Sequence, residues 1–472
     1  MSGGPGTVGI VAISSIAGLV VRLLMIFLSP RWGYYHDHDD LARWGLQCVE
    51  QGILTIYDRP PAPAELSLWT DQGWAIARRD MDRLCNYPPL CVYLLAGSGA
   101  VFKATSPDRI INTIYSRASI GLWSVLFDFV LAAGCAKLVS HYRPGRYGLW
   151  AYVVCILAPP FWLVSCLWGQ VDTWVLAPAV WMLWAMVVNR WLVAGVLFGV
   201  TAAMKPQAAA MLPVWALALV TIRPYTKVLR GGLMAGVTFF LLAIPFSLHG
   251  GAAWWKESYQ ANLFEHSKGF TTLMAFNIWY LDVLLTGSVD EKMRWFGITK
   301  AGWGQIGLGL ALIAGFGKMV RQWTGDSRGL IVWTALVMIA FISIPTRVHD
   351  RFILLILPFL LVCAFMWRGV WPGFVVLVVV ATGQVSWPQW LTAASVDWEP
   401  FEKEMRVTYE AKVLQLPPAE RAVQPPIDEF LRHARAEFDV RVSRAKPVEW
   451  TLTLLGLVGT LLAVTGLLRI TS

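Results

Sequence analysis

The sequence VGIVAISSIAGLVVRLLMIFL occupies residues 8–28, and an acidic stretch, GYYHDHDDLARWG, follows at residues 33–45. The first segment is almost entirely apolar and has the length, about 20 residues, that crosses the hydrocarbon core of a bilayer as a helix. No Lys or Arg precedes Arg22, and no small-residue cleavage site follows the segment. We therefore expect a retained membrane span here rather than a cleaved signal peptide.

The composition indicates that many further spans follow. Of the 472 residues, 56% are hydrophobic and only 15% are charged, whereas about a quarter of the residues in soluble domains are charged. We predict an all-α polytopic membrane protein with about 12 transmembrane helices. The candidate spans are residues 8–28, 117–139, 148–166, 172–189, 191–204, 208–222, 232–248, 302–320, 328–344, 351–367, 372–386 and 449–468.

The basic residues predict the orientation of these spans. The net charge of +9 comes without a basic run interleaved with aromatics, which favours loops facing lipid headgroups and excludes a nucleic-acid partner. If the apolar stretch 89–103 does not cross the membrane, one set of loops collects the basic residues, and the positive-inside rule places that set in the cytoplasm. We therefore expect a re-entrant or juxtamembrane helix at 89–103 and cytoplasmic N- and C-termini. The basic loops are those at residues 141–146, 190, 223–230, 318–328 and 368.

Three parts of the chain follow from this topology. Residues 1–386 are expected to form the transmembrane module, with a long first external loop at residues 29–116. Residues 387–448 form a charged external segment with two amphipathic helices, at about 399–415 and 426–443. Residues 449–472 contain the last span and a short cytoplasmic tail.

The acidic stretch carries three carboxylates within four residues, Asp37, Asp39 and Asp40. In a helix, Asp37, Asp40 and Trp44 share one face by the spacing of helical neighbours. The simplest interpretation is a solvated juxtamembrane helix in which Asp39 or Asp40 pairs with Arg43. The alternative is an active site.

The remaining polar clusters favour the active site because all of them fall on the same, non-cytoplasmic side. Ionisable residues at membrane depth are costly, and they face a cavity or a partner. Convergence of acids, bases and amides on one side is typical of an active site. These clusters are Asn86–Leu90, Trp168–Asp172, Lys205–Gln207, Ala275–Trp279 and Arg347–Arg351.

Each cluster also has a structural interpretation. Trp168–Asp172 has the composition of an interfacial turn with Asp172 capping the next helix. Lys205 fits a snorkelling side chain beside a kink. Two Arg flanking a His at 347–351 suit a phosphate, and an internal Arg–Asp pair is the alternative. Asp128, in the middle of a span, is expected to be a structural partner of Arg22 rather than a catalyst.

From about residue 20 to 365, the order of these motifs resembles the GT-C fold glycosyltransferases. The nearest resemblance is to prokaryotic proteins related to the second GPI mannosyltransferase, and a more distant one is to the ER glucosyltransferases that extend lipid-linked oligosaccharides. The motifs that carry it are the acidic stretch, Tyr-Pro-Pro-Leu at 87–90, Trp-Gly-Gln-Val-Asp at 168–172, Lys-Pro-Gln at 205–207, Ala-Phe-Asn-Ile-Trp at 275–279 and Arg-x-His-Asp-Arg-Phe at 347–352.

The resemblance implies transfer of a sugar from a polyprenyl- or dolichyl-phosphate donor on the non-cytoplasmic face. It implies a general base seven residues before a Trp, which is Asp37 counted back from Trp44, and donor-phosphate binding by Arg347, His349 and Arg351. The prokaryotic likeness favours a bacterial plasma membrane with the site facing the periplasm or exterior. The relatives often have a Glu where this chain has Asp350, and the segment 387–448 has no counterpart in them.

We therefore expect an inverting hexosyltransferase, with mannose favoured by analogy alone. Its partners are membrane lipids, the lipid-phosphate sugar donor and a lipid, glycan or protein acceptor. Lys205 is a further phosphate ligand, and Asp39 and Asp40 are expected to assist Asp37. No cofactor is required by this chemistry, and the acid cluster leaves a divalent metal open. The expected substrate-binding residues are Tyr87, Gln170, Asp172, Gln207, Asn277 and Trp279.

Other functions remain open at this level. A transporter or lipid-linked-sugar flippase is the rival, although inverted repeats and broken helices at the midplane are not evident. An acyl- or phosphotransferase would need a nucleophile or metal cage that the sequence does not offer. Cys48, Cys85 and Cys91 share one external loop, so a disulfide among them also remains open.

Overall fold

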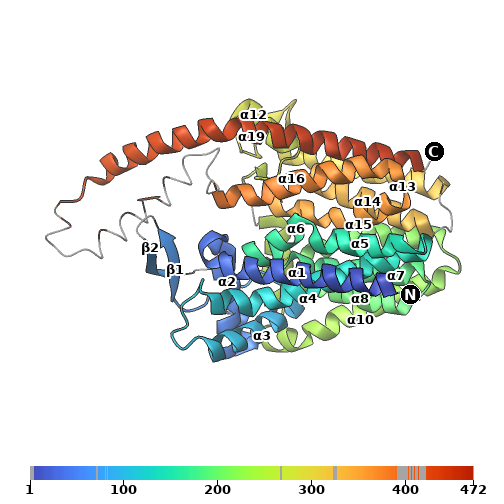
Figure 1. Cartoon of the computed structure of the whole chain (residues 1–472), viewed down its shortest axis with the longest axis horizontal. Helices are drawn as coiled ribbons and strands as arrows, with labels where there is room; N and C mark the ends of the chain where they lie inside the picture. Colours follow the sequence, from blue (N-terminus) through green and yellow to red (C-terminus); the bar gives the residue numbers. More distant parts are fainter. Residues whose placement is uncertain are drawn as a thin grey trace.

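A computed structural model describes residues 5–470, apart from 71, 72, 80, 82, 266, 267, 323–326, 391–401 and most of 403–422. The described chain is a mainly helical bundle with the N- and C-termini at the same end (Figure 1). Six helices are long and apolar enough to cross a membrane, and a bent pair raises this number to seven. The six are α1 (Pro5–Trp32), α4 (Ile114–Tyr142), α10 (Tyr225–Gly250), α13 (Lys300–Gln322), α16 (Trp371–Trp390) and α19 (Ile427–Ile470).

Shorter apolar helices complete the bundle. Each of the 12 predicted spans overlaps a helix, although several of these helices are too short to establish how many spans there are. The predicted span 351–367 begins as the 3-10 helix η5 (Asp350–Leu355) before α15 (Leu357–Met366). The others are α5 (Arg146–Leu157), α6 (Pro159–Trp162) with η2 (Leu163–Trp168), α7 (Asp172–Val187), α8 (Trp191–Met204), η3 (Pro206–Met211) with α9 (Leu212–Thr221), α14 (Ser327–Ser343) and η6 (Arg368–Val370).

Prolines and a glycine break the helices where functional motifs begin. Pro159 and Pro160 separate α5 from α6, and the pair is bent by 43°. Gly169, with φ +84°, ends η2 in a left-handed conformation that glycine adopts without strain. Lys205 is extended between α8 and η3 because Pro206 starts a new helix after it. The motifs at 168–172 and 205–207 therefore occupy helix breaks.

The connections at the end away from the termini hold most of the remaining structure. The predicted re-entrant stretch is α3 (Pro89–Thr105), which packs against α2 (Tyr35–Glu50) in the half of the bundle away from the termini (Figure 1). The other elements of these connections are η1 (Ile53–Tyr57), the antiparallel hairpin β1 (Ala64–Thr70) and β2 (Gly73–Arg79), α11 (Ala253–Trp255), η4 (Lys256–Glu265), α12 (Ile278–Thr286), the hairpin β4 (Arg294–Trp295) and β5 (Ile298–Thr299), and the parallel pair β3 (Thr272–Leu273) and β6 (Val348–His349).

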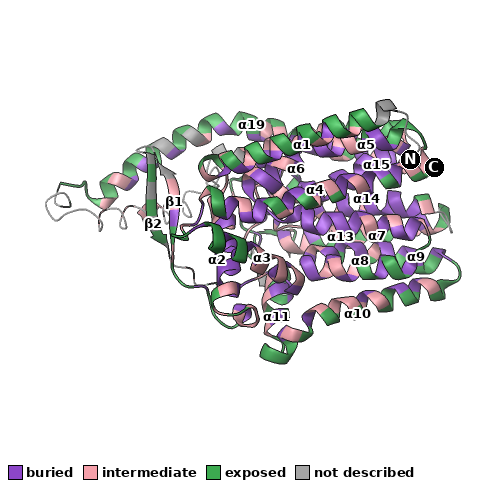
Figure 2. Cartoon of the chain, turned by 60° about the horizontal axis from the view of Figure 1, so that its bottom comes forward, coloured by how far each residue is buried: buried purple, intermediate pink, exposed green. Residues whose placement is uncertain are grey.

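The core is apolar, and the outer faces of peripheral helices are apolar and exposed, as expected for contact with lipid (Figure 2). One ion pair is buried between spans. Arg22 Nε lies 2.6 Å from Asp128 Oδ2, which confirms the expected structural partnership. Ser165 Oγ donates to the same oxygen at 2.8 Å.

The C-terminal part of the described chain is a single long helix. One continuous helix, α19, contains both the expected amphipathic helix at 426–443 and the last span. The expected helix at 399–415 lies mostly outside the described residues.

Candidate active site

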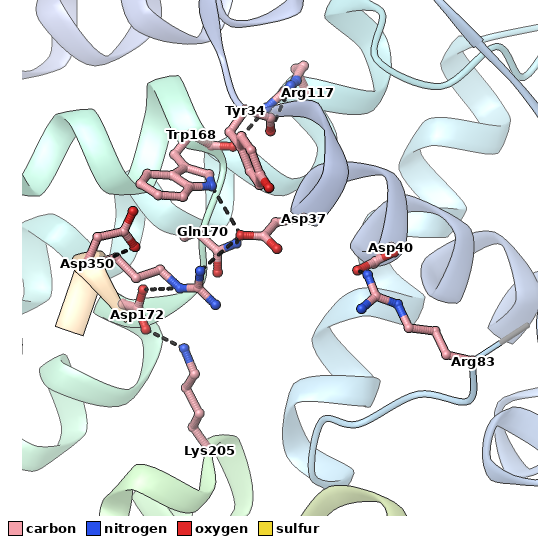
Figure 3. A network of polar contacts seen from close by, with 11 residues as sticks. Tyr34, Asp37, Asp40, Arg83, Arg117, Trp168, Gln170, Asp172, Lys205 and Asp350 are labelled. Carbon is pink, nitrogen blue, oxygen red and sulfur yellow. Dashed lines mark hydrogen bonds and ion pairs between the residues drawn. The ribbon is translucent and has the colours of Figure 1, made fainter. Parts of the chain in front are cut away.

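The carboxylate of Asp37 is the centre of a polar network at the start of α2. Its Oδ2 accepts three hydrogen bonds, from Trp168 Nε1 at 3.1 Å, Gln170 Nε2 at 2.6 Å and Arg351 Nη1 at 3.1 Å (Figure 3). Its Oδ1 has no hydrogen-bond donor within the described part of the chain, and the side chain lines a cavity. Three donors on one oxygen therefore fix the direction in which the other oxygen points.

Arg351 connects Asp37 to a second carboxylate. Its Nε lies 3.6 Å from Asp172 Oδ2, and Lys205 Nζ pairs with Asp172 Oδ1. Burial lowers the pKa of Lys205 against the opposing effect of Asp172. Two acids and two bases thus meet at this side of the cavity.

Asp350 adds a third acid whose charge depends on pH. Burial raises its pKa to about 7, although the charge of Arg351 acts in the opposite direction. The backbone N–H of Arg351 donates to Asp350 Oδ1 at 2.7 Å. Gln384 of α16 donates to the carbonyl oxygen of Asp350, which fixes the start of η5.

The other acids of the α2 stretch have separate partners. Asp39 is buried and pairs with Arg43, whose Nε lies 2.5 Å from Oδ1, so the expected pairing within the helix is confirmed. Asp40 pairs with Arg83, which follows the β1–β2 hairpin (Figure 3). Asp40 lines the cavity, whereas Asp39 does not. Of the three acids of the α2 stretch, Asp37 and Asp40 therefore face the cavity.

The cavity has a volume of about 350 Å³. Polar residues of α2, the two helix breaks and the start of η5 line it. A set of apolar residues from η3, α13 and α14, called the apolar arm, also lines it: Ala210, Leu308, Met338 and Phe341. Nine of the expected site residues line this cavity: Asp37, Asp40, Tyr87, Gln170, Lys205, Gln207, Arg347, His349 and Arg351.

Arg347 lines the cavity but is already paired. It binds Glu291 through Nε at 2.7 Å and Nη2 at 2.8 Å, and its Nη1 donates to the carbonyl oxygen of Phe264. Its backbone is left-handed, with φ +64°. These contacts indicate that Arg347 joins the 256–301 connection to β6. They favour this role over that of a free phosphate ligand.

Asn277 and Trp279, expected to bind substrate, lie outside this cavity. Asn277 Oδ1 accepts from the backbone N–H of Trp279 at 3.0 Å and of Tyr280 at 3.3 Å, so Asn277 caps α12. Trp279 Nε1 donates to the carbonyl oxygen of Ile344 at 2.6 Å. Both residues brace the wall of the site.

Sequence reasoning missed Arg117, at the start of α4. It is fully buried and donates to Asn112 Oδ1 at 2.8 Å, to the carbonyl oxygen of Trp168 at 2.8 Å and to that of Tyr34 at 3.3 Å. It thus joins the residue before α2 to the Trp168–Asp172 motif. An arginine opening the apolar stretch 117–139 was the available signal. Arg83 and Glu291 carried no such signal.

The described residues contain no group of three or more His, Cys, Asp or Glu side chains placed to hold a metal. Cys48, Cys85 and Cys91 are all buried and free.

Comparison with known proteins gives one family match. Residues 87–287, less than half of the chain, match the model of Glycosyltransferase family 87. No curated protein matches the chain. The chain is similar to the apo crystal structure of ArnT from Cupriavidus metallidurans, with a TM-score of 0.48 and 13% identity over 96% of this chain and 78% of that one. The family match, on a chain with several helices long and apolar enough to cross a membrane, supports a membrane glycosyltransferase.

Proposed function

We propose that this membrane glycosyltransferase is an inverting enzyme that moves a hexose, with mannose as the first candidate, from a polyprenyl-phosphate donor to a lipid, glycan or protein acceptor. The observation that carries the proposal is the arrangement of Asp37. Its Oδ1 is open in a cavity that also holds two cations and an apolar arm. An acceptor hydroxyl, a lipid phosphate and a lipid chain each have a chemically matched position there.

The reaction assigns one step to each group. Asp37 takes the proton of the acceptor hydroxyl while that oxygen attacks the anomeric carbon. The bond from this carbon to the phosphate oxygen breaks, and the electron pair leaves with polyprenyl phosphate. General-base help of this kind contributes about 10²–10⁴-fold.

Two cations are placed for the departing phosphate. Arg351 Nη2 makes no hydrogen bond within the described residues, while its Nη1 binds Asp37. Lys205 Nζ lies 5.8 Å from the centre of the Tyr87 ring and 5.6 Å from that of Phe352, at the same end of the cavity. Fixed cations directed at developing negative charge are a major source of catalysis.

The apolar arm suits the lipid part of the donor. Leu308 of α13 and Met338 and Phe341 of α14 line it. α13 has a largely exposed apolar surface, as expected for a helix facing lipid. In this proposal the polyprenyl chain lies along the apolar arm and its phosphate lies at Arg351. A water-soluble sugar nucleotide has no lipid chain and would not require such an arm.

The orientation is part of the proposal. Both termini lie at the end of the bundle opposite α2 and α3 (Figure 1). The positive-inside rule favours a cytoplasmic position for the terminal end and therefore a periplasmic or external position for Asp37 in a bacterial plasma membrane.

Asp37→Asn tests the catalytic assignment. The amide preserves shape but is not a base, so transfer from radiolabelled polyprenyl-phosphate mannose to a crude lipid acceptor should fall by about 10² or more. Asp58→Asn, in the same external loop and outside the cavity, should retain transfer.

Thermal unfolding in detergent serves as the control for folding of both variants. Substantial transfer by a folded Asp37→Asn variant would remove Asp37 from the role of base. Movement of label across the membrane without a new product would instead support the flippase.

A further inference from the structure

Large apolar side chains are exposed on the connection between α10 and α13. Ile278 and Leu285 of α12 are 54% and 69% exposed, and Phe296 is 99% exposed. Ile278 and Leu285 are seven residues apart and therefore share one face of the helix. The opposite face is buried through residues such as Tyr280 and Val283. Together with Phe296, the exposed side chains of Ile278 and Leu285 are called the apolar patch of this connection.

Phe296 is presented by a tight turn. It and Gly297 have positive φ angles, +50° and +82°, between strands β4 and β5. The base of the turn is fixed, because Lys300 N donates to the carbonyl oxygen of Met293 at 2.9 Å and Trp303 Nε1 donates to that of Trp295 at 2.9 Å. The exposure of Phe296 therefore belongs to an ordered hairpin.

The same connection is anchored to the protein on its inner side. Lys300 Nζ lies 2.6 Å from Asp282 Oδ2, and both side chains are buried. Asn277 caps α12. These contacts hold α12 and the β4–β5 hairpin together as one unit at the beginning of α13.

This unit packs beside helices that are long and apolar enough to span a membrane. α12 packs beside α19 (Figure 1), and the backbone of Phe276 lies against Gly456, where an added Cβ would come 2.6 Å from Phe276 O. Gly456 is inside the apolar half of α19. Phe296 precedes the apolar helix α13, whose Leu310 and Ile313 are exposed. The patch is therefore continuous with surfaces that face lipid.

The charges beside the patch match lipid headgroups. Lys292 and Arg294 are exposed on the hairpin. Cations next to aromatic and aliphatic side chains are typical of segments that bind the interface of anionic bilayers.

We propose that Ile278, Leu285 and Phe296, with Lys292 and Arg294, form an interfacial anchor that inserts into the leaflet at the cavity end and binds anionic lipid. Ala301 and Gln305, at the start of α13, line the cavity. The anchor thereby fixes this wall of the cavity at headgroup depth, where a lipid-linked substrate carries its phosphate.

Depth measurement tests the anchor without donor or acceptor, so its result is independent of the proposed reaction. The full chain carrying Phe296→Cys is labelled with an environment-sensitive NBD probe in nanodiscs of phosphatidylcholine alone or with phosphatidylglycerol. The seven native cysteines are buried, and the unsubstituted chain gives the labelling background. We expect blue-shifted emission and quenching by brominated acyl chains, both stronger with phosphatidylglycerol.

Two sites on the same chain calibrate the result. Leu310→Cys on the exposed face of α13 should report lipid, and Val423→Cys, at an exposed position outside the bundle, should report water. When K292E and R294E are added to Phe296→Cys, phosphatidylglycerol should no longer increase the blue shift or the quenching. Emission like that of Val423→Cys in both bilayers would overturn the anchor. A blue shift that persists in detergent and rises with protein concentration would also overturn it, because a second copy would then cover Phe296.

Discussion

Arg117 joins three parts of the site through one guanidinium. Its hydrogen bonds reach Asn112, the carbonyl oxygen of Trp168 and the carbonyl oxygen of Tyr34. Tyr34 precedes the helix that carries Asp37, and Trp168 donates to Asp37. Arg117 is not among the residues that line the cavity, so we expect it to be a positioning residue that acts through Asp37.

Arg117→Lys keeps the charge but offers a single ammonium for these three contacts. We expect kcat to fall by about 10²-fold with the donor KM nearly unchanged, since small displacements of a reacting group cost that much. Steady-state kinetics over a range of donor concentrations provide the measurement. A loss of thermal stability with unchanged kcat in the surviving enzyme would show a purely structural role.

The raised pKa of Asp350 predicts a pH dependence. Its carboxyl is neutral below a pKa of about 7 and charged above it, next to Asp37, Asp172 and Arg351. A folded-state pKa above the unfolded value means that the native state binds more protons, so this group lowers stability as pH rises from about 4 to 7. A new negative charge beside the phosphate site should also raise the donor KM above pH 7.

Asp350→Asn removes this titration. The donor KM of the variant should stay flat between pH 6 and 8, where that of the native enzyme rises. The kinetics of both proteins over this pH range provide the measurement. An equal rise in both would exclude Asp350 as the titrating group.

Helices α2 and α3 approach closely enough to require glycine. A Cβ at Gly99 would lie 2.0 Å from the carbonyl oxygen of Gly45, whereas a Cβ at Gly97, on the same helix, has Trp123 at 3.7 Å as its nearest neighbour. The position of α2, and with it Asp37, therefore depends on this contact between the two backbones.

Gly99→Ala should destabilise the protein by about 1–3 kcal/mol, the usual cost of overpacking, and should also lower transfer because α2 is displaced. Gly97→Ala is the matched control and should change neither property. The prediction is checked by measuring the thermal unfolding and the sugar transfer of both variants. Equal behaviour of the two would contradict the close packing.

At the scale of the whole molecule, the orientation can be tested with single cysteines. Val423 precedes α19, whose first half extends past the bundle (Figure 1), and Arg146 lies at the start of α5; both are exposed. Val423→Cys should react with a membrane-impermeant maleimide in intact cells, and Arg146→Cys only after permeabilisation, because basic loops remain in the cytoplasm. The reverse pattern would place the site in the cytoplasm.

Hydrophobic length predicted most of the fold, since every expected span overlaps a helix. It did not show that the amphipathic helix at 426–443 and the last span are continuous, as they are in α19. A change from polar to apolar residues does not by itself show whether the helix ends at that point.

The site was only partly predictable. Motifs at helix breaks, such as Lys205–Gln207, stood out because polar residues interrupt apolar sequence. The Asn277–Trp279 motif stood out for the same reason, although a helix cap produces the same pattern as a ligand. Arg83 and Glu291 meet their partners through folding alone, at separations of 43 and 56 residues along the chain.

The helix α19 is much longer than a membrane span requires. Its 44 residues span about 66 Å at 1.5 Å per residue, roughly twice the thickness of the hydrocarbon core. The outer half extends past the bundle beyond the cavity end (Figure 1). With the last span expected at 449–468, Asp428 lies some tens of ångströms beyond the start of that span along α19. The number of helical turns determines that distance, and deletions of whole turns would shorten it in steps of about 5.4 Å.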